Sequence, residues 1–291
     1  MSRVASGLLR SATMPITIAR AAGLSLVTFA LVGAAAAEEA PLPPAAPVAF
    51  TTLGADGLES HVTVQLGLQD LEGDGASTIK RFDLGGQFMG NGNAGAYGSI
   101  AFATIEDDSS FTALEAGGVY RVRGATTDTA LRAGLVLPTL RMADDASLGD
   151  LLLPSYSTAL SRPSDLVTAA HETTTLRLAA APTYRSGQLV LRADVGLDIP
   201  VDAPGSTPDP IYHVDLGAAL QTPRVAVTAE LENVGSTDSD AEGMLHVLAL
   251  GVQARRDRIM PFATVSLPFS TGSDSEDLGN YNAFLGARFG I

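Results

Sequence analysis

An alternation of apolar and polar side chains, repeated twelve times, constrains this chain more than any other feature of its sequence. In residues 188–199, every second side chain from Leu189 to Ile199 is apolar, and Arg192 and Asp194 lie among the residues between them. A period of two is typical of a β-strand with one apolar and one polar face. The twelve predicted strands are 61–69, 79–89, 96–105, 111–122, 129–138, 173–184, 188–199, 211–221, 225–233, 244–254, 259–269 and 281–291.

The composition excludes several classes of protein. The 291 residues include no Cys, which excludes a disulfide framework, Cys-ligated zinc, iron–sulfur clusters and thiol catalysis. With 32 acidic against 18 basic residues, the net charge is −14. Nucleic-acid binding depends on a basic surface, so we expect no nucleic-acid partner.

The first residues are typical of an export signal rather than of a folded element. Residues 1–37 contain three Arg and no acid, then the apolar run 21–33 and a cluster of alanines. This order predicts a secretory signal peptide cleaved after Ala37, with translation starting at Met1 or Met14. Residues 38–57 begin with a Pro- and Ala-rich stretch and are predicted to be an N-terminal linker.

Alternating strands can form a sandwich with apolar faces inward, or a barrel with its apolar face toward lipid. The connections between the twelve strands alternate between short turns and longer polar loops, as in an up-and-down barrel. The polar face also carries more charge and glycine than a packed soluble core would. We therefore predict an all-β, antiparallel transmembrane β-barrel over residues 58–291, with about twelve strands.

In such a barrel the polar face of the strands surrounds a hydrated lumen. The predicted lumen-lining residues are Arg81, Asp83, Glu115, Arg132, Arg177, Arg192, Asp194, Asp198, His213, Asp215, Glu230, Glu232 and Arg288.

Aromatic residues on the apolar face gather near the strand ends, as they do at the two interfaces of a membrane. Those predicted at the rim with short turns are Phe88, Tyr120, Tyr184 and Phe289, and those at the opposite rim are Phe102, Tyr212, Phe269 and Tyr281.

The signal peptide, the alternating segments and the last strand, YNAFLGARFGI, together resemble Gram-negative outer-membrane β-barrel proteins of the porin-like kind. That class usually ends in Phe or Trp, whereas this chain ends in Ile291 with Phe289 two residues before. The resemblance implies export through the periplasm to the cell outer membrane. It also implies outer-membrane lipid and the barrel assembly machinery as partners.

Residues 139–172 form the longest connection, and they are too apolar for a loop surrounded by water. Three placements remain open. The segment can fold into the lumen, cover the mouth of the barrel, or add a hairpin that raises the strand number to fourteen.

Motifs for catalysis are weak. Residues 90–95 match G-x-G-x-x-G, but a strand follows them, so a hairpin turn is favoured over a dinucleotide site. Residues 238–243 resemble the start of a calcium loop but lack the Glu required at the twelfth position. His246 has the parity of the apolar face, whereas Ser266 has the parity of the lumen. We expect no enzyme activity, cofactor or resident metal, and outer-membrane lipid hydrolysis is a distant alternative.

The function favoured by the sequence is a passive channel for small polar solutes. The longer loops carry seventeen acidic residues against Arg141 and Arg162, which predicts a weak cation preference. The main alternative is a non-conducting structural barrel. Its acidic loops would engage lipopolysaccharide, through divalent cations, or another surface partner.

Overall fold

A computed structural model gives the fold of this chain. It describes residues 48–70, 78–106, 108–138, 157–159, 161–169, 173–202, 209–237, 244–255, 258–271 and 281–291. The predicted signal peptide and the acidic motif at 238–243 lie outside these residues. No helix among the described residues has the length and apolar character needed to cross a membrane.

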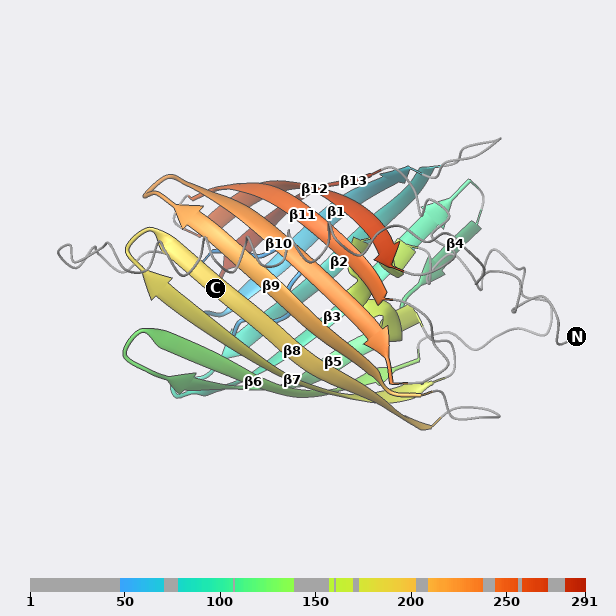
Figure 1. The fold of residues 1–291 in the computed structure, drawn as a ribbon, viewed down its shortest axis with the longest axis horizontal. Helices are drawn as coiled ribbons and strands as arrows, with labels where there is room; N and C mark the ends of the chain where they lie inside the picture. The colour runs from blue at the N-terminus through green and yellow to red at the C-terminus, as the bar shows by residue number, and fades with distance from the viewer. Residues whose placement is uncertain are drawn as a thin grey trace, which may run out of the picture.

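Strands account for most of the described chain, and they follow one another antiparallel around a single barrel (Figure 1). Their bounds are β1 His61–Asp70, β2 Thr78–Met89, β3 Ala94–Ile105, β4 Asp108–Phe111, β5 Leu114–Arg123, β6 Thr127–Leu137, β7 Thr174–Ser186, β8 Leu189–Asp202, β9 Ile211–Gln221, β10 Val225–Ser236, β11 Met244–Ala254, β12 Ile259–Thr271 and β13 Asn282–Gly290.

The barrel closes because β1 pairs with both of its neighbours in the ring. It pairs with β2 along its whole length and with β13 from His61↔Gly290 to Gln69↔Asn282. β4 has four residues, pairs with β3, and is separated from β5 by Thr112 and Ala113. The predicted strand 111–122 covers most of β5 and reaches β4 only at Phe111. The closed barrel therefore has twelve strands, as predicted.

The two faces of the wall follow the predicted alternation. In β1, Gln65 is 4% exposed, whereas the next residue, Leu66, is 60% exposed. The predicted rim aromatics Phe88, Tyr120 and Tyr281 are also exposed and stand at strand ends. An outer face of exposed Leu, Val and Phe side chains is the surface that a barrel presents to hydrocarbon.

The two ends of the barrel differ in their connections. At one end, here called the short-turn end, tight turns join β2 to β3, β5 to β6, β7 to β8 and β9 to β10. One of these is the glycine motif at 90–95: the Gly90 amide donates to the Ala94 carbonyl at 2.9 Å, which closes a hairpin. The opposite end is the long-loop end.

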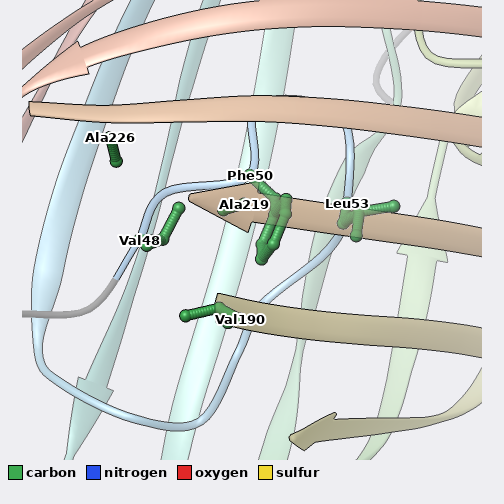
Figure 2. Close-up of a cluster of buried hydrophobic side chains, with 6 residues drawn as sticks. All are labelled: Val48, Phe50, Leu53, Val190, Ala219 and Ala226. Atoms are coloured by element: carbon green, nitrogen blue, oxygen red, sulfur yellow. The ribbon is translucent and has the colours of Figure 1, made fainter. Parts of the chain in front are cut away.

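Two segments that are not strands lie inside the barrel. Residues 48–57, which precede β1, occupy the lumen at the short-turn end (Figure 2). At the long-loop end the lumen holds residues 157–159 and 161–169, which include the 3-10 helix η1 (Pro163–Ala169). Of the three placements predicted for residues 139–172, the described part thus takes the one inside the lumen and adds no hairpin.

Candidate functional site: the barrel lumen

All thirteen side chains predicted to line the lumen are buried on the inner face of the wall, each at most 9% exposed. The sequence suggested a hydrated interior. In the structure most of these groups instead pair with one another or with the two inner segments. The interior is therefore a network of charged contacts.

Arg177 on β7 is the centre of this network at the long-loop end. Its guanidinium donates to Asp198 on β8 at 2.8 Å and to Glu115 on β5 at 2.9 Å. It also reaches η1, donating to Asp165 at 2.7 Å and to the Ser164 carbonyl at 2.6 Å. One buried arginine therefore fixes the inner helix to three strands of the wall.

Further contacts hold residues 157–169 against the opposite side of the wall. Arg81 on β2 donates to Thr158 at 2.8 Å and forms an ion pair with Asp83 at 2.8 Å. Across the lumen, Glu232 on β10 accepts hydrogen bonds from the amide and the hydroxyl of Ser164. The inner segment is therefore attached to strands on several sides of the lumen.

Asp165 on η1 lies between two guanidinium groups, those of Arg162 at 3.0 Å and Arg177 at 2.7 Å. Burial by itself raises the pKa of Asp165, but the two arginines outweigh that effect and hold the pKa at about 2. Asp165 is thus ionised at neutral pH and forms part of the attachment of η1.

A second cluster lies nearer the middle of the barrel. Asp194 on β8 accepts hydrogen bonds from Arg132 and, at 3.0 Å, from Arg192. The Nε2 atom of His213 lies 3.6 Å from the same carboxylate. Two arginines on one aspartate make this a pre-formed polar site rather than a neutral core.

The N-terminal inner segment is attached mainly through Glu230 on β10. This carboxylate accepts hydrogen bonds from the amides of Thr51 and Thr52, at 3.0 and 2.8 Å, and from both hydroxyls. The Ala49 amide donates to Gln253 at 2.9 Å. Sequence analysis placed Glu230 in the lumen but did not predict that it binds residues 51 and 52.

Asp56 completes the attachment of this segment. Its carboxylate accepts hydrogen bonds from Arg288 on β13 at 3.0 Å and from Gln87 on β2 at 2.6 Å. Burial raises the pKa of Asp56, but Arg288, His61 and Arg192 outweigh it and hold that pKa well below its usual range. Sequence analysis assigned 38–57 to a linker; residues 48–57 are instead packed in the lumen, and 38–47 lie outside the described residues.

A cavity of about 120 Å³ remains between the inner segments and the wall. Its lining combines arginines with a smaller number of carboxylates and the phenol ring of Tyr97. The ionisable residues that line it are Asp56, His61, Arg81, Asp83, Tyr97, Glu115, Arg132, Arg162, Asp165, Arg177, Arg192 and Arg288.

The residues considered for lipid hydrolysis do not meet. His246 lies on the outer face, stacked on Phe269 with 5.0 Å between ring centroids, and its Nδ1 is 2.8 Å from Asn233. Ser266 is fully buried on the lumen side, where it accepts a hydrogen bond from Asn282. The barrel wall therefore separates the two groups. Among the described residues, no cluster of three or more His, Asp or Glu could hold a metal ion.

Solved structures resemble the whole barrel. An outer-membrane channel from Pseudomonas putida F1 superposes with a TM-score of 0.58 at 12% identity, over 84% of this chain and all of that one. The fold is a closed antiparallel β-barrel like that of this outer-membrane protein. The NanC porin superposes with a TM-score of 0.51 at 10% identity, over 79% of this chain and all of the other. No family model and no curated protein matches the sequence.

Proposed function

We propose that this protein is a passive channel of the cell outer membrane for small polar solutes, with a weak preference for cations. The observation that carries the proposal is the inner face of the wall, where thirteen buried ionisable side chains line one lumen. A barrel that served only as an anchor would not need so many desolvated charges, because burying them is costly. The channel folds with TM-scores above 0.5 support the same reading.

The outer face supports the location. Its exposed apolar side chains fit outer-membrane lipid, which the chain would reach through the periplasm and the barrel assembly machinery. Binding of lipopolysaccharide through divalent cations at the acidic loops belongs to the alternative, the structural barrel.

The weak cation preference follows from the acidic loops. The described interior is close to balanced: it holds nine acidic side chains and six guanidinium groups, but Asp215 and Glu232 form no ion pair in the described chain, and more arginines than carboxylates line the cavity. The carboxylates are those of Asp56, Asp83, Glu115, Asp165, Asp194, Asp198, Asp215, Glu230 and Glu232, and the guanidinium groups are those of Arg81, Arg132, Arg162, Arg177, Arg192 and Arg288.

A non-conducting structural barrel is the second candidate, because residues 48–57 and the described residues of 157–169 both occupy the lumen. Single-channel recording of the refolded chain in planar bilayers separates the two candidates. Discrete conductance steps are the result expected of a channel. A folded, inserted barrel that never conducts, even after residues 48–57 are displaced, would favour the structural barrel.

A further inference from the structure

We propose that residues 48–57 are a detachable plug, whose departure clears the short-turn half of the lumen and widens the path through the barrel. This inference rests on the proposed channel function and adds the element that regulates it. The plug is defined as residues 48–57, and the wall as the twelve strands of the barrel.

The wall does not depend on the plug for its own hydrogen bonds. The ring is closed by backbone pairing of β1 with β13. Between the described residues, the hydrogen bonds that join plug and wall all involve a wall side chain, such as Gln253, Glu230 or Arg192. The plug can therefore leave without breaking a strand ladder.

The surface that the plug covers is suited to water. Behind it stand Gln87, Glu230, Gln253, Thr264 and Arg288, all buried while the plug is in place. Water entering the vacated lumen would hydrate these groups, so the cost of exposing them is lower than for an apolar core. A segment that stayed in the lumen permanently would not require polar wall side chains behind it.

The apolar contact between plug and wall is confined to one patch. Figure 2 shows Val48, Phe50 and Leu53 facing a wall patch that consists of Val190, Ala219 and Ala226. These three plug side chains are each at most 9% exposed, so their burial is the main apolar contribution that holds the plug in place, and weakening it should release the plug.

Gly217 on β9 forms the seat of the plug. A Cβ atom built on Gly217 would lie 2.7 Å from the Phe50 ring and 2.9 Å from Leu53. The absent side chain makes room for the two largest apolar residues of the plug. The wall is therefore shaped to receive this segment, in the manner of a binding site.

A cysteine pair can lock the plug, because the native chain has no Cys to interfere. The hydroxyls of Thr51 on the plug and Thr264 on β12 are 3.1 Å apart, so cysteines there are close enough for a disulfide. In the double variant Thr51→Cys, Thr264→Cys, we expect oxidation to hold the pore in its low-conductance state. Reduction with dithiothreitol should restore openings to native frequency, at least about tenfold above the locked protein.

A second variant displaces the plug without altering the wall. Phe50→Asp with Leu53→Asp puts two carboxylates into an apolar seat beside Glu230, which favours the released state by at least about tenfold. We expect long-lived openings from this variant, whereas Phe50→Leu, which keeps the seat apolar, should behave as the native chain does.

Thiol labelling follows the plug without relying on ion flow. In the single variant Thr51→Cys, a charged methanethiosulfonate reagent should react at least about tenfold faster when Phe50→Asp and Leu53→Asp are also present. The plug hypothesis would be wrong if Thr51→Cys were labelled at the same rate with and without the two Asp substitutions, and if the oxidised and reduced cysteine pair conducted equally. That result would not contradict the channel function. Fast labelling in a folded barrel that never conducts would uphold the plug's release while overturning the channel function.

Discussion

At the scale of single residues, Arg177 is the side chain that joins the largest number of buried carboxylates in the described interior. Its guanidinium is shared by Glu115, Asp165 and Asp198. In Arg177→Met, Glu115 and Asp198 would remain buried without their paired cation and Asp165 would keep only Arg162, and losing one partner of a buried ion pair costs about 3–5 kcal/mol. We expect the free energy of unfolding in urea to fall by that amount.

The matched control for Arg177 is Arg123→Met. Arg123 is exposed at the end of β5, where charges contribute little to stability. An equal loss of unfolding free energy in both variants would contradict the role assigned to the buried network.

Asp165 should give the interior a pH dependence. Its pKa in the folded protein is about 2, below the ordinary carboxyl value of 3.8. A depressed pKa contributes stability that is present above the unfolded pKa and is lost as the pH falls toward the folded pKa. We expect Asp165→Asn to reduce the free energy of unfolding by about 2 kcal/mol at pH 7, and the difference from the native chain to shrink as the pH falls from 4 and to vanish below about pH 2. A difference that stays constant from pH 7 to pH 2 would exclude this ionised state as its cause.

The outward parity of the strands also makes a residue-scale prediction. Leu66 lies mid-way along β1 and is 60% exposed. Leu66→Arg should destabilise the lipid-embedded barrel by roughly 2–4 kcal/mol, because arginine is most costly at the bilayer midplane. Leu66→Ala controls for the lost side chain. Phe88→Arg, at the end of β2, controls for depth and should cost only about 0–1 kcal/mol.

At the scale of elements, the sequence predicted the wall well because lipid and lumen impose opposite polarity on neighbouring residues. Each strand therefore alternates apolar and polar residues with a period of two. This pattern is local, so it can be recognised in the sequence without knowledge of the fold. The predicted strand 225–233, for example, is contained in β10, which extends to Ser236. The break between β4 and β5 at Thr112 and Ala113 left no such local sign.

The contacts of the two inner segments could not be predicted from a local sequence pattern. Thr51 binds Glu230, a residue 179 positions away, and Ala49 binds Gln253, 204 positions away. Because these partners are so distant, nothing in the sequence near residues 48–57 indicates them. The segment also contains too few apolar residues to show a strand or helix periodicity. Residues 157–169 gave a stronger signal, since the apolar character of their loop already excluded full exposure to water.

The same reasoning explains why the lumen residues could be found while their pairing could not. Parity assigned Arg132 and Asp194 to one face, but β6 and β8 are joined in the ring only through β7. Their ion pair therefore spans an intervening strand, and strand order alone does not specify which lumen side chains meet.

At the scale of the whole molecule, the pairing of β1 with β13 and of β2 with β3 closes the described strands into a ring. Because unfolding such a ring requires many ladder bonds to break together, we expect the protein to stay folded in SDS until it is heated. The measurement is gel migration before and after boiling. Identical migration of the two samples would contradict a stable closed barrel.

The balance of charge over the whole molecule makes the last prediction, that of ion selectivity. The interior is close to balanced, with six arginines and four carboxylates around its cavity, whereas acidic residues prevail in the long loops by sequence. A low-dielectric mouth focuses the field of these groups, so cations should be enriched there. Since most interior charges are paired, we expect the preference to be weak. Salt should weaken the preference further, because the Debye length falls from about 10 Å at 0.1 M to about 3 Å at 1 M.

The measurement that tests this selectivity is the reversal potential across a salt gradient in planar bilayers, taken at low and at high ionic strength. A strong anion preference at both would mean that the arginines around the cavity, Arg81, Arg132, Arg177 and Arg192 among them, set the selectivity. The loop acids would then lie too far from the ion path to matter.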